Sequence, residues 1–295
     1  MIFLKLGGSL ITDKTQANTP RLDVIRRLAR EIQFSILNSQ FSTLLGHGSG
    51  SFGHAAAKRY GTRAGVHDAA GWRGFAEVSV AAARLNRIVA DALHEAGVPV
   101  ISFCPSASAR CMDGRLVYLD VAPIRAALNH GLVPLVMGDV AFDDARGGTI
   151  VSTEEVFAYL ADALPVTHVL LAGETEGVYR GFEPRSREDA KAGMEDHLVP
   201  SRLRGDIVPR ITPLNWDEIR GSVSGSHGAD VTGGMASKVR DMLDLVAAHP
   251  TVTVRIFSGL VEGNLVRALR GEPIGTEIVA TDDARLVGPS APMNV

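Results

Sequence analysis

The chain has 295 residues, of which 45% are hydrophobic and 21% charged, so it can bury the core of one large α/β domain or of two lobes. Its net charge of −3 and its scattered Lys and Arg residues argue against a nucleic-acid partner. It has only two cysteines, and its apolar start is too short for a signal peptide or a membrane span. We therefore expect a cytoplasmic protein with neither disulfides nor a membrane partner.

Short apolar runs alternate with amphipathic stretches along the chain. The runs are rich in Val, Leu and Ile and end near Gly or Pro, which is typical of strands buried on both faces of a parallel sheet. This alternation predicts right-handed βαβ units and an α/β fold, a three-layer αβα sandwich around a mostly parallel open sheet. The expected strands cover residues 2–6, 42–45, 98–103, 132–137, 168–172 and 252–257, and the expected helices cover residues 22–37, 75–96, 122–129, 154–164 and 237–249.

Two stretches interrupt the alternation. Residues 61–74 contain four glycines and are expected to form a loop suited to covering a ligand. Residues 180–230 are polar and rich in Pro, Arg and Gly, and a connection of this length usually carries a function or small elements of its own. We expect an edge strand at residues 206–211. A boundary near Pro165 would divide one continuous sheet into two halves.

A glycine turn follows the first predicted strand, in the sequence Lys5-Leu6-Gly7-Gly8-Ser9. Its backbone N–H groups would emerge at the carboxyl end of the sheet, where α/β proteins bind ligands. Paired glycines allow the main chain to approach phosphate oxygens, and Lys5 can place a cation on them. Lys14 follows nine residues after Lys5, and no Walker motif is present. A tight turn with a surface lysine is the structural alternative.

A second glycine-rich segment, residues 46–54, follows the second predicted strand and reads Gly-His-Gly-Ser-Gly-Ser-Phe-Gly-His. Because glycine is costly in backbone entropy, we interpret this segment as a second anion cradle. His54 could hold a phosphate that the acceptor already carries. His47 has no such spacing argument and is expected to be structural.

A third glycine segment, residues 230–238, opens the last long predicted helix, and Lys238 in its first turn could reach a transferring phosphate. Three glycine turns with lysines at one sheet edge supply the positioning and charge neutralisation that phosphoryl transfer requires. Carboxylates follow two of the strands at Glu154, Glu155, Glu174 and Glu176. One of them could orient the ammonium groups and another could act through Mg²⁺.

These motifs resemble the amino acid kinase superfamily and, within it, the isopentenyl phosphate kinases. The resemblance covers nearly the whole chain and includes residues 5–9, 50–54, 58–61, 85–89, 138–139, 176–179, 232–235 with Lys238, and 275–276. It implies a single amino acid kinase-like domain, residues 1–295. Residues 1–165 would form the acceptor-binding half and residues 166–295 the nucleotide-binding half.

The resemblance also implies roles for individual residues. Lys5 and Lys238 would bind the γ-phosphate, Lys14 would stabilise the transition state, and Glu154 would complete the catalytic set. The implied ATP-binding residues are Lys5, Gly7, Gly8, Ser9, Gly50, Glu174, Gly177, Tyr179, Gly234 and Lys238. The implied acceptor-binding residues are His54, Ser49, Thr153, Gly138, Val140 and Ile150, the last two in an apolar pocket beside the helix from Phe75.

Some positions depart from the family pattern. The family usually has Ser-Gly-Asp where this chain has Ser152-Thr153-Glu154, and Asp-x-Asp-Gly where it has residues 174–177. Ser49 also stands where glycine is common. A Cβ at Thr153 is expected to intrude where the backbone should approach the acceptor phosphate.

The implied activity is ATP-dependent phosphorylation of isopentenyl phosphate to isopentenyl diphosphate, a step of isoprenoid biosynthesis. ATP and Mg²⁺ would take part, no metal ligand is assigned to the protein, and a homodimer is expected. Two alternatives stay open. One is a kinase for another small phosphate or phosphonate, such as the antibiotic-phosphorylating relatives that act on fosfomycin, and the other is a nucleotide-binding protein without turnover.

Overall fold

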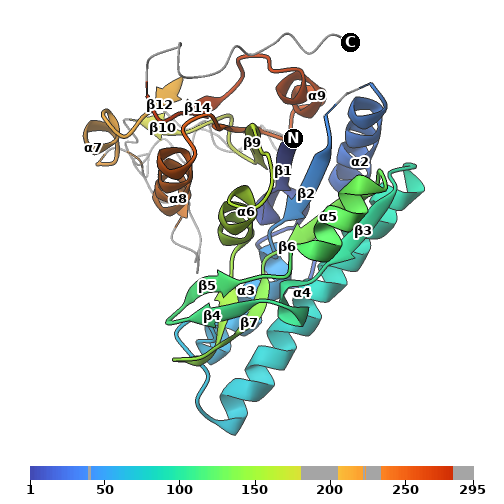
Figure 1. The fold of residues 1–295 in the computed structure, drawn as a ribbon, viewed down its shortest axis with the longest axis vertical. Helices are drawn as coiled ribbons and strands as arrows, with labels where there is room; N and C mark the ends of the chain where they lie inside the picture. The colour runs from blue at the N-terminus through green and yellow to red at the C-terminus, as the bar shows by residue number, and fades with distance from the viewer. Residues whose placement is uncertain (39–40, 181–204, 222, 224–233, 282–295) are drawn as a thin grey trace, which may run out of the picture.

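The computed structural model describes residues 1–38, 41–180, 205–221, 223 and 234–281. Its main sheet has eight strands in the order β12-β14-β13-β9-β1-β2-β6-β3 (Figure 1). All neighbouring strands are parallel except β13 and β14, which are antiparallel. These strands are β1 (Ile2–Leu6), β2 (Thr43–His47), β3 (Val100–Phe103), β6 (Val133–Met137), β9 (His168–Gly173), β12 (Arg210–Ile211), β13 (Thr253–Ser258) and β14 (Thr276–Ile278).

Helices cover both faces of this sheet, because its central strands are apolar on both sides. One face packs on α5 (Ala122–Asn129), α6 (Thr153–Ala161), α7 (Trp216–Ile219) and α8 (Gly234–Ala248). The other face packs on α1 (Gly8–Ile11), α2 (Leu22–Leu37), α4 (Ala69–Glu95) and α9 (Asn264–Leu269). The three-layer αβα architecture predicted from the sequence is confirmed.

A four-stranded sheet, in the order β5-β4-β7-β8, lies near α3 (Gly50–Tyr60) and α4 at one end of the molecule (Figure 1). A small apolar cluster of Ala57, Val66, Phe75, Val78 and Val140 joins these two helices to the sheet. The remaining elements are β4 (Arg110–Met112), β5 (Arg115–Tyr118), β7 (Asp139–Asp143), β8 (Gly147–Val151), the 3-10 turn η1 (Pro105–Ala107), and a two-stranded sheet of β10 (Tyr179–Arg180) and β11 (Asp206–Ile207).

The predicted bounds of β1, α2 and α5 are confirmed, whereas the other predicted bounds differ from the structure by one or more residues. Residues 69–74 are helical, so the expected loop 61–74 is only half as long. The reason is Asp68, whose side chain accepts a hydrogen bond from the Gly71 N–H (2.7 Å) and caps α4 six residues before the predicted start at residue 75. The expected edge strand at residues 206–211 is two strands, and only β12 lies at the edge of the main sheet.

The glycine-rich segment at residues 46–54 is not one loop. Strand β2 continues through His47, and helix α3 begins at Gly50. Only Gly48 and Ser49 connect the two elements, so the segment predicted to be a second anion cradle is mostly the start of a helix.

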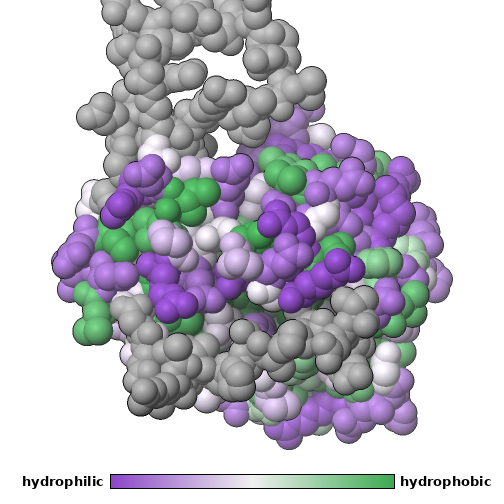
Figure 2. Space-filling model, turned by 90° about the horizontal axis from the view of Figure 1, so that it is seen from above, coloured by the Kyte–Doolittle hydropathy of each residue, from purple (hydrophilic) through white to green (hydrophobic). Residues whose placement is uncertain are grey.

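None of the helices in the described ranges combines the length and hydrophobicity needed to span a bilayer. On the face drawn in Figure 2, hydrophobic residues form small groups separated by hydrophilic ones.

Candidate active site

The central parallel strands end at the same edge of the sheet, and their glycine turns meet there. The N–H of Gly7 donates to the Ala172 carbonyl (2.8 Å), which links the end of β1 to β9. The N–H of Gly48 donates to the Leu6 carbonyl (3.0 Å), and the N–H of Gly138 donates to the backbone carbonyl of His47 (3.3 Å). The first two predicted glycine turns therefore lie side by side at the carboxyl edge of the sheet, the usual position for an α/β ligand site.

The two turns touch directly at Gly8 and Gly50. A Cβ on Gly8 would overlap the backbone N and Cα of Gly50, so no larger residue fits at this contact. Gly50 has a φ of +50°, a conformation that L-residues with side chains rarely adopt. Helix α1 begins at Gly8 and helix α3 at Gly50, so the N-termini of both helices lie at this contact.

Lys5 lies at the base of this space. Along β1, Phe3 belongs to the core cluster under α6, and Lys5, two residues later, points to the same face. Its ammonium group forms a buried ion pair with Glu154 in the first turn of α6; the residues are 6% and 5% exposed. Burial alone would raise the pKa of Glu154, but the positive charges of Lys5 and Lys238 hold this pKa below its ordinary value. The structure thus brings three of the four predicted catalytic residues together, Lys5, Lys238 and Glu154, whereas Lys14 lies on an exposed segment.

Helix α6 is fixed by a capping box. The Ser152 hydroxyl accepts from the Glu155 N–H (3.1 Å), and the Glu155 carboxylate accepts from the Ser152 N–H (2.6 Å). Arg63, which the sequence did not single out, also donates to Glu155 (3.2 Å) and to the Ile150 carbonyl (3.0 Å). The loop after α3 is therefore fastened to the start of α6.

The expected steric conflict at Thr153 is not seen. Its hydroxyl donates to the His47 carbonyl (2.7 Å), and its methyl group lies in the space that Gly46 leaves open. The Thr153 side chain is therefore buried against β2 without a clash inside the protein, and its expected intrusion on the acceptor phosphate stays a prediction. Gly138 lies next to it, and a Cβ there would come within 3.6 Å of the Thr153 backbone N.

His47 is structural, as predicted. The ring is fully buried and contacts the Gly48 carbonyl through Nδ1 (3.2 Å) and the Asn86 side-chain amide through Nε2 (3.1 Å). Burial, together with the nearby charge of Lys5, lowers the pKa of His47 to about 4, although the contact with Gly48 opposes this shift. His47 is therefore neutral near pH 7.

This buried neutral His47 predicts a pH-dependent stability. Its pKa is about 4 in the folded protein and 6.5 as a model value for the unfolded chain, so the unfolded state binds the proton more tightly. The neutral His47 ring makes its whole contribution to the free energy of unfolding above pH 6.5. This contribution should fall by about 3 kcal/mol as the pH is lowered to 4. Urea denaturation across this range checks the slope.

His47→Gln is the control for that slope, because it removes the titrating ring. Asp241 acts in the opposite direction in both proteins, since burial and repulsion from Glu154 raise its pKa to about 6. The variant should therefore show a flatter loss of stability in acid than the parent protein. Equal slopes would contradict the assignment.

The predicted acceptor residues surround the first turns of α3. His54 is partly buried one turn after Gly50, and Ala57 on the same helix face packs in the apolar cluster with Val140. Ile150 packs against this cluster from β8. The side chain of Ser49 lies against the helix backbone, where a Cβ on Gly53 would come within 2.8 Å of its Oγ. The polar side chain of His54 and the apolar cluster around Val140 thus lie next to each other, near the joined glycine turns.

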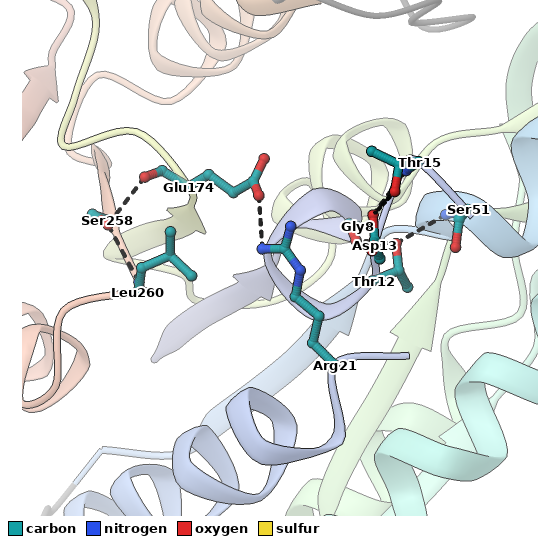
Figure 3. Close-up of polar contacts among 9 residues, drawn as sticks. All are labelled: Gly8, Thr12, Asp13, Thr15, Arg21, Ser51, Glu174, Ser258 and Leu260. Atoms are coloured by element: carbon teal, nitrogen blue, oxygen red, sulfur yellow. Dashed lines mark hydrogen bonds and ion pairs between the residues drawn. The ribbon is translucent and has the colours of Figure 1, made fainter. Parts of the chain in front are cut away.

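On the nucleotide side, the predicted residues are more dispersed. The carboxylate of Glu174 pairs with Arg21 (2.8 Å), as Figure 3 shows, so this side chain is held by α2. The Tyr179 hydroxyl donates to Glu176 (3.0 Å), and burial raises the pKa of Tyr179 to about 12. Gly177 packs against Thr276, where no Cβ would fit. Gly234 begins α8 with a φ of +72°, whereas residues 230–233 of the third glycine motif lie outside the described residues.

The described part of the chain contains no group of three His, Cys, Asp or Glu side chains that could hold a metal ion. Both cysteines have a raised pKa, chiefly because of burial, as expected for ordinary thiols.

A parallel-sheet sandwich whose glycine turns meet beside a buried lysine is typical of a class of phosphate-transferring proteins. Residues 1–192 match the amino acid kinase family, and the chain belongs to this family. The resemblance predicted from the sequence motifs is confirmed.

Within the family, the chain is similar to isopentenyl phosphate kinases. The one from Methanothermobacter thermautotrophicus is 34% identical over 287 residues, which cover 94% of this chain and 98% of the relative. The one from Haloferax volcanii is 36% identical and covers 90% of this chain and 98% of the relative. A crystal structure of an isopentenyl phosphate kinase matches with a TM-score of 0.73 at 30% identity, over 95% of this chain and all of the other.

Proposed function

We propose that this protein phosphorylates isopentenyl phosphate with ATP and forms isopentenyl diphosphate. The observation that carries the proposal is the contact between the two glycine turns beside the buried Lys5–Glu154 pair. The names of relatives that match nearly the whole chain support the same acceptor. In this reaction an oxygen of the acceptor phosphate attacks the γ-phosphorus, the bond from that phosphorus to the bridging oxygen breaks, and ADP leaves. An anionic acceptor needs no general base.

The donor phosphates would bind beside the joined turns, where glycines at positions 8 and 50 let the two backbones meet at the carboxyl edge of the sheet. Lys5 and Lys238 would neutralise the transferring phosphate, and Glu154 would keep both ammonium groups directed at it. Lys14, on the exposed segment before α2, would add charge in the transition state. The remaining residues proposed around ATP are Gly7, Ser9, Glu174, Gly177, Tyr179 and Gly234.

The acceptor would bind beside the first turns of α3, on the other side of the joined glycine turns from the nucleotide. His54 would hold the phosphate of the acceptor by a charge-assisted hydrogen bond, with Ser49, Gly138 and the Thr153 backbone around it. The short hydrocarbon tail would lie against the apolar cluster that Val140 and Ile150 share with α4. Residues 1–165 would then bind the acceptor and residues 166–295 most of the nucleotide.

Mg²⁺ belongs to this proposal as the ion that neutralises charge on the ATP phosphates. Because the described residues offer no cluster of three ligands, it would be held mainly by phosphate oxygens and water.

A cytoplasmic homodimer also belongs to the proposal. The edge strand β3 exposes Ile101, and the outer face of α4 exposes Val80. Both features suit an interface between two copies of the chain.

A coupled ADP-release assay with a panel of acceptors tests the function. We expect the largest kcat/KM for isopentenyl phosphate and no turnover of isopentenol, which lacks the phosphate that His54 would bind. Preferred turnover of a phosphonate or of another small phosphate would replace the proposed acceptor by the alternative one. ATP binding without turnover of any acceptor would contradict the kinase function.

A further inference from the structure

One buried hydroxyl group connects the two glycine turns. Thr12 has no exposed surface, and its Oγ1 donates to the Gly8 carbonyl (2.7 Å) and accepts from the Ser51 N–H (2.9 Å), as Figure 3 shows. Gly8 belongs to the first turn and Ser51 to the first turn of α3. Thr12 thus uses both hydrogen-bonding functions of its hydroxyl to tie the two loops together.

Thr12 is also one end of the segment that carries Lys14. Thr12 and Pro20 form an antiparallel bridge, and the Asp13 N–H donates to the Thr19 carbonyl (2.9 Å), which closes the base of the segment. The C-terminal end of the segment, at Asn18 and Thr19, is also hydrogen-bonded to Ser51. The Thr19 N–H donates to the Ser51 hydroxyl (3.3 Å), and the N–H of Asn18 donates to the Ser51 carbonyl (3.3 Å).

We propose that Thr12 is a positioning residue for phosphoryl transfer, which holds the Lys14 segment over the joined glycine turns. This inference rests on the proposed kinase function. Thr12 does not touch the substrates itself. It acts through the backbone of Gly8 and Ser51 and through the segment whose base it forms. Phosphoryl transfer depends on such positioning, because the protein supplies little covalent chemistry.

Thr12→Val tests the inference, because it keeps the shape of the side chain and removes both hydrogen bonds. A small displacement of catalytic groups can cost about 10²-fold in rate, so we expect kcat to fall between about tenfold and 10²-fold with a KM for ATP within about threefold of the parent. Thr12→Ser retains the hydroxyl and should restore most of the rate. Unchanged kcat in Thr12→Val would overturn the proposal, as would an equal loss in Thr12→Ser.

Thr212→Val is the matched control. Thr212 is equally buried, and its hydroxyl has no hydrogen-bond partner within the part of the chain that the structure describes. The same exchange of hydroxyl for methyl should leave kcat unchanged there. A comparable loss in this variant would show that Thr12→Val acts through general stability, and the proposal would fail.

A double-mutant cycle with Lys14→Ala separates positioning from a structural role. If Thr12 acts by holding Lys14, Thr12→Val should lower kcat much less in the Lys14→Ala background than in the parent. If the two substitutions lowered kcat independently, so that their fold losses multiplied in the double variant, the proposal would be overturned. Should Thr12→Val fail to fold, Ser51→Ala, which removes the contact to Thr19, takes its place in the cycle with the same expectation.

Hydrogen exchange gives a readout that does not depend on the acceptor. Residues 13–19 and the first turn of α3 should exchange faster in Thr12→Val and not in Thr12→Ser. Equal exchange in both would contradict the role of Thr12 in the fold, whereas a parent protein inert toward isopentenyl phosphate would contradict only the proposed function.

Discussion

Lys5→Met is expected to lower kcat by about 10³-fold, because it removes a cation aimed at the transferring phosphate from a buried site. It should also destabilise the protein by about 3–5 kcal/mol, since Glu154 would remain as a buried carboxylate without its closest partner. Steady-state kinetics and urea denaturation measure the two effects separately.

The double variant Lys5→Met/Glu154→Leu separates charge burial from catalysis. Replacing both members of a buried ion pair by apolar residues is often neutral or stabilising, so the double variant should regain most of the lost stability. Its kcat should stay as low as that of Lys5→Met. Recovery of activity together with stability would show that Lys5 serves the fold alone.

His54→Ala is expected to lower kcat/KM for isopentenyl phosphate between about tenfold and 10²-fold, the value of a hydrogen bond to a charged group. The KM for ATP should change little, because the nucleotide is proposed to bind on the other side of the joined glycine turns. Initial rates with each substrate varied in turn measure this difference.

His249→Ala is a suitable control for His54→Ala. The Nε2 atom of His249 contacts the Asp162 carboxylate (2.9 Å) at the ends of α8 and α6. Its removal should leave both KM values unchanged. If His54→Ala raised the two KM values equally, the role of His54 in acceptor binding would be refuted.

The central sheet could be predicted from the sequence because strands buried on both faces give continuous apolar runs. Helix α3 could not, because its glycines have low helix propensity and its stability comes from packing on α4. Strands β4 and β5 have only three and four residues and are partly exposed, so their pattern is weak. Strands β7 and β8 are mostly buried, but β7 begins and ends with aspartate and β8 begins with two glycines, which interrupts the apolar run. The predicted fold was therefore right in its layers and incomplete at the end that carries the four-stranded sheet.

Lys5, Lys238, Glu154 and the glycine turns were singled out because each lies at the end of a strand or in the first turn of a helix. Contacts between distant segments gave no such signal. The pairing of Arg21 with Glu174 joins positions far apart in the sequence, and the orientation of Thr153 depends on the space above Gly46. Thr12 was missed for the same reason, since its role follows from two hydrogen bonds that only the folded chain creates.

The central claim is that phosphate is transferred from ATP to a phosphate group. Phosphorus NMR of the purified protein incubated with ATP, Mg²⁺ and isopentenyl phosphate tests it most directly. We predict that the acceptor resonance disappears and is replaced by the two coupled resonances of a diphosphate ester, together with an equal amount of ADP. An unchanged acceptor resonance, or release of inorganic phosphate without a diphosphate product, would contradict the account.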